Sequence, residues 1–264
     1  MKIHVLTENT SLKPELAAEH GLSLYIETEK HNILFDTGQS DVFLSNAEKM
    51  GVDLKKADLV ILSHGHYDHG GGLMTFLKYN DHAKIYMNEH AFLPYYHGEE
   101  RYIGLDTKLK DSGRLVMVGD ELKLDEELSL YSCNEKELFT PIESFGLTKF
   151  ENGNYLPDDF RHEQYLLIHE NGKKVLISGC SHKGILNIVH WFEPDVLVGG
   201  FHFMKLDPEK PEDREKLNRA AKELLRFPIQ YYSGHCTGVP QYEYLKTIMK
   251  DRLDAIHVGK VFEI

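Results

Sequence analysis

The chain has 264 residues, of which 41% are hydrophobic and 27% are charged, proportions typical of a globular protein with a sizeable core and not of a disordered one. Its formal charge of −12 and isoelectric point near 5.7 argue against general binding to nucleic acid, which depends on clustered lysine and arginine. We therefore expect no nucleic-acid partner, and we interpret residues 1–264 as a single α/β domain.

The first part of the chain predicts strands and one helix. Three short apolar blocks, at residues 3–6, 22–26 and 32–35, indicate antiparallel strands. Asp36 follows the third block, where a carboxylate can serve simply as a turn former. Ser40 suits the N-cap of a helix that ends at Gly51. An apolar strand at 58–63 comes next.

The strand at 58–63 leads directly into residues 64–69 (HGHYDH) and then into three consecutive glycines. Three imidazoles and a carboxylate on a glycine-rich turn indicate a metal site. His64 and His66 lie two residues apart in an extended segment, so their side chains project to the same side and can bind one ion. Asp68 and His69 diverge after the turn, which suits a second ion or the far side of the first. These ligand types suit zinc, and also iron or manganese.

Between residue 88 and about residue 164 the sequence loses clear periodicity and gains aromatic and polar residues. Long irregular segments of a compact enzyme commonly form binding loops, so we predict that this insert recognises the substrate. Two short strands, at 115–118 and 128–131, interrupt it. For any single aromatic residue, packing in a satellite core is an equally good interpretation. Residues 158–163 (DDFRHE) carry ligand-type side chains, but an exposed charged loop explains them more simply. The roles of His90 and His162 stay open.

The second half repeats the alternation of strands and helices. A hairpin at 165–178 precedes a helix at 185–192, and a strand at 196–198 precedes a helix between Pro211 and Pro228. A strand at 229–232, a helix at 240–251 and a closing strand at 255–258 complete the chain. Four apolar strands, ending near residues 63, 178, 199 and 232, are each followed by a glycine and a histidine. Because ligands gather at the carboxyl ends of strands, we expect one cleft between two packed sheets.

Cysteine use and hydropathy indicate the compartment. Cys133, Cys180 and Cys236 are widely spaced and form no CxxC pair, so a disulfide framework is not expected. The chain shows no signal-peptide core at its start and no run of membrane-spanning length. We expect a reduced, cytoplasmic protein with no membrane partner, and we leave open whether it forms a homodimer.

The HxHxDH motif at 64–69, with Phe35-Asp36-Thr37-Gly38 before it, resembles the signature of the metallo-β-lactamase-fold hydrolases. Further motifs, GCSH at 179–182, GGFH at 199–202 and GHCTG at 234–238, resemble the branch labelled dihydropterin or ribofuranosylaminobenzene 5'-phosphate synthase-like. The resemblance covers essentially the whole chain. It implies a four-layer αββα sandwich, the metallo-β-lactamase fold.

The resemblance also implies a set of metal ligands. They are His64, His66 and His182 around one ion, and Asp68, His69 and His235 around the other, with Cys180 close to both. Many relatives have an aspartate that bridges two metals where this chain has Cys180, so the number of ions, one or two, and the role of Cys180 stay open. Zinc is the expected metal, with manganese and iron as alternatives. Asp36 is expected to orient the ligands without binding an ion.

Such a site predicts hydrolysis of a small-molecule substrate. A metal ion lowers the pKa of a bound water toward neutrality and polarises the oxygen under attack. Asp68 is expected to orient that water. His202, a weaker ligand candidate, is expected to contact the substrate or to donate a proton to the leaving oxygen. The substrate is expected to be an ester, a lactone or a phosphoester, and the resemblance to the branch favours a phosphorylated or heterocyclic compound.

Three other functions remain open at this point. An iron-dependent oxidoreductase of the same fold would keep the imidazoles and could use Cys180. A pterin-related synthase would need a basic pyrophosphate-binding loop, for which the sequence gives no sign. A non-catalytic metal-binding module would need neither the full ligand series nor the aromatic insert. A serine or cysteine hydrolase is poorly supported, because no GxSxG motif is present.

Overall fold

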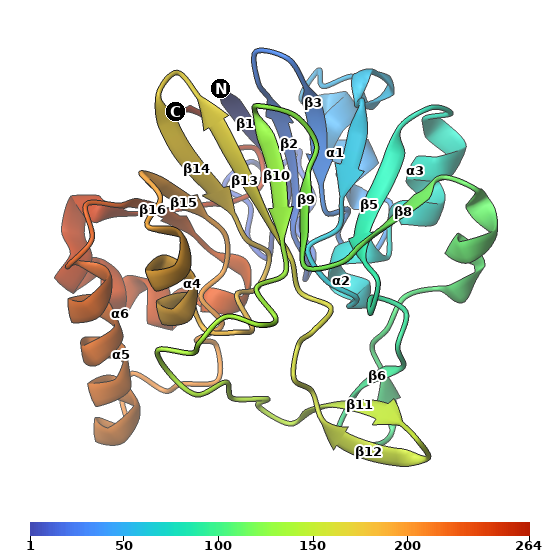
Figure 1. The fold of residues 1–264 in the computed structure, drawn as a ribbon. Helices are drawn as coiled ribbons and strands as arrows, with labels where there is room; N and C mark the ends of the chain where they lie inside the picture. The colour runs from blue at the N-terminus through green and yellow to red at the C-terminus, as the bar shows by residue number, and fades with distance from the viewer.

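The computed structural model describes residues 1–264 as two seven-stranded sheets packed face to face, with helices on both outer faces (Figure 1). Across the first sheet, the strands follow the order β18 (Val261–Glu263), β1 (Lys2–Thr7), β2 (Ser23–Glu27), β3 (Asn32–Phe35), β4 (Leu59–Ile61), β5 (Lys84–Asn88) and β8 (Leu115–Val118). Across the second, the order is β17 (Leu253–Ala255), β16 (Gln230–Ser233), β15 (Val196–Val198), β14 (Lys173–Ile177), β13 (Tyr165–Glu170), β10 (Leu128–Tyr131) and β9 (Glu121–Lys123). The predicted αββα sandwich is confirmed.

Helices cover each sheet on its outer side. The α-helices are α1 (Val42–Lys49), α2 (Tyr67–Gly70), α3 (Leu73–Tyr79), α4 (Ile185–Phe192), α5 (Pro211–Leu224) and α6 (Val239–Met249). Short 3-10 helices are η1 (Leu54–Lys56), η2 (Thr107–Ser112), η3 (His235–Thr237) and η4 (Lys250–Arg252). No helix has both the length and the apolar character needed to cross a bilayer.

The period-two alternation of the strands divides the core into layers. In β14, Val175 and Ile177 face the other sheet, whereas Leu176 packs beneath the helices. One apolar layer therefore lies between the sheets, a second beneath α4, α5 and α6, and a third beneath α1 and α3. Burial of apolar side chains on both faces of each sheet is the main source of stability for this architecture.

The centre of each sheet is parallel, and this brings strand ends together. In the first sheet β3, β4 and β5 run parallel, and in the second β14, β15, β16 and β17 do so. The carboxyl ends of β4, β14, β15 and β16 carry the motifs that contain glycine and histidine, and β3 ends directly before Asp36. The sequence expectation that these motifs meet at strand ends therefore has its structural basis in the two parallel centres.

Residues 88–164 contribute to three sheets. Strand β8 completes the first large sheet, and β9 and β10 complete the second. The remaining strands, β6 (Tyr95–His97), β7 (Arg101–Tyr102), β11 (Leu147–Glu151) and β12 (Asn154–Pro157), form a small antiparallel sheet. This small sheet projects from the main body beyond α2 (Figure 1).

The closing strand differs from its prediction at 255–258. Strand β17 ends at Ala255, and the chain then turns before β18 pairs antiparallel with β1. Ile256 and Val258 are buried although they lie in the connection, and Val258 N donates to Thr10 O at 2.9 Å. Apolar loop residues that pack into the core gave the appearance of a strand.

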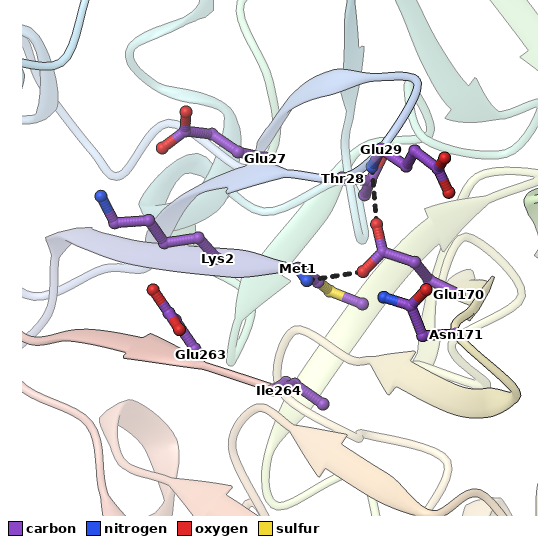
Figure 2. A pocket seen from close by; sticks show the side chains of 9 residues that line it. All are labelled: Met1, Lys2, Glu27, Thr28, Glu29, Glu170, Asn171, Glu263 and Ile264. Carbon is purple, nitrogen blue, oxygen red and sulfur yellow. Dashed lines mark hydrogen bonds and ion pairs between the residues drawn. The ribbon is translucent and has the colours of Figure 1, made fainter.

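A polar hollow of about 470 Å³ lies near the start of β1 and the end of β13, at the end of the two sheets away from the histidine motifs (Figure 2). The Met1 ammonium lies 2.6 Å from Glu170 Oε2, and Glu170 Oε1 accepts a hydrogen bond from Glu29 N at 2.6 Å. Glu170 ends β13 in the second sheet, whereas Met1 precedes β1 and Glu29 follows β2 in the first. One carboxylate thus links the two sheets at the end away from the histidine motifs.

Candidate metal centre

Three histidines from both halves of the chain meet at one point. His64 and His66 follow β4, and His182 follows β14, and their ligand atoms lie within 4.8 Å of one another. His64 Nε2 lies 3.3 Å from His182 Nε2. His66 Nε2 is buried and has no hydrogen-bond partner. Since a buried polar atom without a partner is costly, a cation among these three rings fits the arrangement. This group corresponds to the first predicted ligand set.

The second predicted ligand set is equally compact. Nε2 of His69 lies 3.1 Å from Nε2 of His235. Oδ2 of Asp68 lies 3.8 Å from His69 Nε2 and 3.6 Å from His235 Nε2. Cys180 Sγ lies 3.2 Å from His69 Nε2. The structure therefore brings together every residue predicted to bind metal, with Cys180 next to the second set.

Asp36 fixes the orientation of two of these rings from behind. Its Oδ2 lies 2.7 Å from His69 Nδ1 and accepts a hydrogen bond from Ser63 Oγ at 2.7 Å. Because the Ser63 hydroxyl donates to the carboxylate, it accepts from His64 Nδ1, which lies 2.8 Å away. When neutral, both rings then carry the proton on Nδ1 and leave Nε2 as an acceptor toward the centre. This is the geometry required for the supporting role predicted for Asp36.

His235 is oriented by two residues that the sequence analysis missed. Asn9 Oδ1 accepts a hydrogen bond from Gly21 N at 3.2 Å and lies 2.9 Å from His235 Nδ1. His235 Nδ1 therefore donates to this oxygen, and Nε2 is left for a metal. Glu8 Oε1 accepts from His235 N at 2.6 Å. The feature of the sequence that could have indicated these two residues is the polar pair Glu8-Asn9 directly after the apolar strand β1.

Close approach of the two halves requires glycine at Gly179. A Cβ atom there would overlap Ser63 Oγ and would lie 3.2 Å from His64 Nδ1.

Several neighbouring positions adopt left-handed backbone conformations without being glycine, with φ of 58° at Asp36, 56° at His202 and 49° at His235. Such conformations concentrate at functional sites, where packing holds them in place.

Burial sets the protonation of the candidate ligands. It lowers the pKa of His64 and His182 well below the usual value, and neighbouring imidazoles add to the effect. It also lowers the pKa of His235 to about 4. Burial opposes ionisation of Asp68, but the adjacent histidines outweigh it and lower the pKa of that carboxyl. Neutral imidazole and ionised carboxylate are the forms that bind metal.

His69 is the exception among the imidazoles. Burial disfavours its charged form, yet the carboxylates of Asp36 and Asp68 outweigh burial and raise its pKa. The facing Nε2 atoms of His69 and His235 need a cation between them, which is either a proton on His69 or a metal ion. A metal ion at this point would take the place of that proton, so binding would release it.

The prediction that residues 158–163 form an exposed charged loop is wrong. Asp158, His162 and Glu163 are 3%, 0% and 0% exposed. His162 Nδ1 accepts a hydrogen bond from Gly65 N at 2.8 Å, and its Nε2 lies 3.1 Å from Asp158 Oδ2. Both ring nitrogens of His162 are therefore occupied, and it supports the HxHxDH turn instead of offering a ligand atom. Burial of this polar segment is tolerated because its groups have partners.

Residues 162–164, which we call the clasp, bind both halves of the centre. Glu163 Oε1 accepts from His182 N at 2.7 Å, and Glu163 Oε2 accepts from Lys183 N at 3.0 Å. Gln164 N donates to Ser63 O at 2.8 Å, and Gln164 Nε2 donates to Leu62 O at 2.8 Å. The signal in the sequence was a polar triplet, His162-Glu163-Gln164, directly before the apolar strand β13.

A cavity of about 430 Å³ opens onto the centre, and ligands from both sets line it. His202 also lines it, with its ring 4.2 Å from that of His182. His20, which the sequence analysis missed, lines it as well and places Nε2 3.2 Å from Asp68 Oδ2. His90 lies outside this cavity and is hydrogen-bonded through its backbone N to Asn88 Oδ1.

Comparison with known proteins identifies the family. Residues 17–235 match the Metallo-beta-lactamase superfamily. The chain belongs to the metallo-β-lactamase superfamily. The matched region includes all the candidate ligands. The resemblance inferred from the sequence motifs is confirmed, and so is the fold that it implied.

Relatives within the metallo-β-lactamase superfamily match nearly the whole chain. It is 30% identical over 272 residues to "Uncharacterized protein MJ0448" of Methanocaldococcus jannaschii, covering 99% of this chain and 100% of that one. It is 29% identical over 289 residues to "7,8-dihydropterin-6-methyl-4-(beta-D-ribofuranosyl)-aminobenzene-5'-phosphate synthase" of the same organism, covering 100% and 96%. The crystal structure of Tm1679, described as a metal-dependent hydrolase of the beta-lactamase superfamily, matches with a TM-score of 0.80 and 28% identity, covering 100% and 99%. These matches support a metal-dependent enzyme.

Proposed function

We propose that the protein is a metal-dependent hydrolase that cleaves a small ester or phosphoester. One ion would be held by His64, His66 and His182, and a second by Asp68, His69 and His235. The observation that carries the proposal is the convergence of these two ligand sets, from distant strand ends, on one cavity. Zinc is the first candidate for both positions, with iron and manganese as alternatives.

A divalent ion bound here would supply the acidity that makes water a nucleophile at neutral pH and would polarise the substrate oxygen. The protein's own groups would then position the reactants. Asp68 is 8% exposed and lines the cavity, so its carboxylate can accept a hydrogen bond from the attacking water. His20, at 3.2 Å, holds that carboxylate in place from the solvent side.

His202 is suited to stabilise the leaving oxygen. Burial lowers the pKa of its imidazole to about 3, so the ring is neutral near pH 7. A neutral imidazole still has one N–H group, and the cavity-lining position of His202 lets it donate a hydrogen bond to a developing negative charge. We therefore assign it as a hydrogen-bond donor in preference to a proton donor.

Cys180 bears on which ion is preferred. Its thiol lies 3.2 Å from His69 Nε2, and burial raises its pKa, so the free thiol is protonated at neutral pH. Binding a soft ion would displace that proton, because thiolate is the form that coordinates metal. A sulfur ligand favours zinc or iron over manganese.

The test is the substitution His66→Ala with His82→Ala as its control. His82 has a 54% exposed side chain and pairs only with its neighbour Asp81. We expect His66→Ala to abolish hydrolysis of a panel of aryl esters and phosphoesters and to lose most of the metal found by elemental analysis, because it removes a ligand. His82→Ala should retain both. Full turnover by His66→Ala would refute the assignment.

A second candidate, a pterin-related synthase activity, is favoured by the 29% identity to the named synthase over nearly the full length of both chains. It predicts formation of the product in that relative's name by the zinc-loaded protein, without turnover of the ester panel. Turnover of the panel without that product supports hydrolysis. Failure in both assays with metal fully loaded would favour a non-catalytic metal-binding module.

A further inference from the structure

Three parts of the lining of the cavity at the candidate metal centre differ in chemistry and bear on what it can bind. The candidate metal ligands form one part. Ile103, Phe145 and Leu147, from the connections and strands of the small sheet, form an apolar part. Arg101 of β7 and Lys205, which follows β15, form a basic part. A substrate that fills the cavity therefore meets ligands, an apolar surface and positive charge.

The basic part stands out against the rest of the protein. The chain carries 42 acidic and 30 basic residues, and four glutamates line the hollow near Met1. In the catalytic cavity Asp68 is the one carboxylate of the lining, and it is assigned to the metal. The cavity is thus lined by two positively charged side chains, and its one carboxylate, that of Asp68, is assigned to bind the metal. Such a cavity attracts anions.

Neither positive charge is neutralised within the chain. The ion pairs of arginine and lysine involve other residues. Arg101 is held by Tyr67, since its Nη2 donates to the Tyr67 hydroxyl at 2.8 Å and its guanidinium lies 5.7 Å from the centre of the Tyr67 ring. Tyr67 precedes Asp68 in α2, so this contact ties the exposed guanidinium to the helix that carries a candidate ligand, and its other N–H groups remain available to a ligand in the cavity.

Phe145 connects the apolar part to the centre. Its ring lies 5.3 Å from the ring of His202, the residue assigned to the leaving oxygen. A flat apolar group placed against Phe145 and Leu147 would therefore have one end near His202. A volume of about 430 Å³ accommodates one ring and its substituents, within the usual range for small-molecule sites.

We propose that the substrate carries an oxyanion, a carboxylate or a phosphate, separate from the bond that is cleaved, and that Arg101 and Lys205 bind it. An apolar body would lie between this anion and the scissile group, against Phe145 and Leu147. The inference rests on the proposed function, because it takes the scissile group to lie at the metal ligands. Arg101 and Lys205 are specificity residues in this scheme, since they bind the part of the substrate that does not react.

The test uses probes that share one metal-binding group. Benzohydroxamate, 4-carboxybenzohydroxamate and 4-phosphonobenzohydroxamate are titrated calorimetrically into the zinc-loaded full-length protein. We expect the two anionic probes to bind roughly tenfold or more tightly than the neutral one, as charge-assisted contacts with two basic side chains imply. A stronger gain for the carboxylate or for the phosphonate identifies which oxyanion the site prefers.

The variant Arg101→Gln/Lys205→Gln removes both charges and leaves a donor for Tyr67. We expect this variant to bind the two anionic probes no more tightly than benzohydroxamate, and to bind benzohydroxamate with the affinity of the wild type. The control Arg219→Gln/Lys222→Gln removes the same charge from α5, away from the cavity, and should keep the gain. Equal binding of all three probes by the wild type, or a gain that survives in the Arg101→Gln/Lys205→Gln variant, overturns the inference.

The same titrations separate this inference from the proposed function. If benzohydroxamate binds and the anionic probes bind no more tightly, the metal assignment is supported and the oxyanion site is refuted. If only the anionic probes bind, with the dependence on Arg101 and Lys205 described above, the oxyanion site stands and the metal assignment falls. If no probe binds, both fall.

Discussion

Asp36 lies at the end of β3 and controls two candidate ligands through one carboxylate. Besides the contacts of Oδ2 with His69 and Ser63, its Oδ1 accepts a hydrogen bond from Ser63 N at 2.7 Å. The group is 0% exposed, so water cannot replace these contacts. Its effect on metal binding is indirect, because it fixes which nitrogen of each ring carries the proton.

Replacing this carboxylate by an amide tests that control. The new side chain would present an NH₂ group to donors that now share two oxygens, so at least one of them loses its acceptor. We expect Asp36→Asn to weaken zinc binding roughly 10- to 100-fold, measured by competition with a chromophoric chelator. Asp81→Asn, at a fully exposed carboxylate, is the control. Unchanged affinity in Asp36→Asn would contradict the role assigned to it.

At the scale of elements, the clasp forms hydrogen bonds with the ends of strands from both large sheets. It holds the end of β4 through Gln164 and the loop after β14 through Glu163. The Glu163 carboxylate also accepts a hydrogen bond from the Tyr165 hydroxyl at 2.6 Å. The position of His182 relative to His64 therefore depends on a segment that contributes no ligand.

The clasp predicts a large loss of stability from a small change. In Glu163→Gln, the amide nitrogen cannot accept a hydrogen bond, so the N–H of His182 or of Lys183 is left buried without a partner. We expect the free energy of unfolding to fall by about 3 kcal/mol, measured by urea denaturation. Glu215→Gln, on the exposed side of α5, should change it little. A loss as small as that of the control would show that the clasp is dispensable.

Local patterns in the sequence were sufficient to predict most elements. The strands predicted for the two large sheets, apart from the closing strand, and the helices α1, α4, α5 and α6 lie within a few residues of their predicted bounds, whereas β9 and β18 were not predicted. Alternating and 3.6-residue apolar periodicities report directly on which face is buried. The αββα arrangement was available from the resemblance, whose motifs sit at the ends of these strands.

The missed parts of the site depend on distant partners. The polar segment at 158–163 looked solvated because nothing nearby in sequence shows that Gly65 N and His182 N would satisfy it. Asn9 and His20 come from the chain after β1, far in sequence from the residues they support. Sequence spacing predicts ligands on one turn well, but it does not report contacts between turns.

For the molecule as a whole, the candidate metal centre takes its residues from both sheets. Each proposed ion has ligands from both halves, with His64 and His66 meeting His182, and Asp68 and His69 meeting His235. Binding at such a site stabilises the docked arrangement by mass action, since the unfolded chain does not present the site.

Removal of metal should therefore lower thermal stability. With free zinc at about a thousand times its dissociation constant, binding contributes about 4 kcal/mol, which corresponds to roughly 8 to 16 °C in the unfolding midpoint of a chain of this size. Calorimetry before and after treatment with a chelator measures the shift. The His66→Ala variant should show little response, and an unchanged midpoint in the wild type would contradict a metal shared between the sheets.

A metal ion shared between the two halves would also order the maturation of the protein. During synthesis, the HxHxDH turn emerges well before His182 and His235, and on its own it offers an incomplete coordination sphere. High-affinity capture of an ion at the proposed site would then follow docking of the two sheets. Metal uptake during refolding would consequently report the docking of the two sheets.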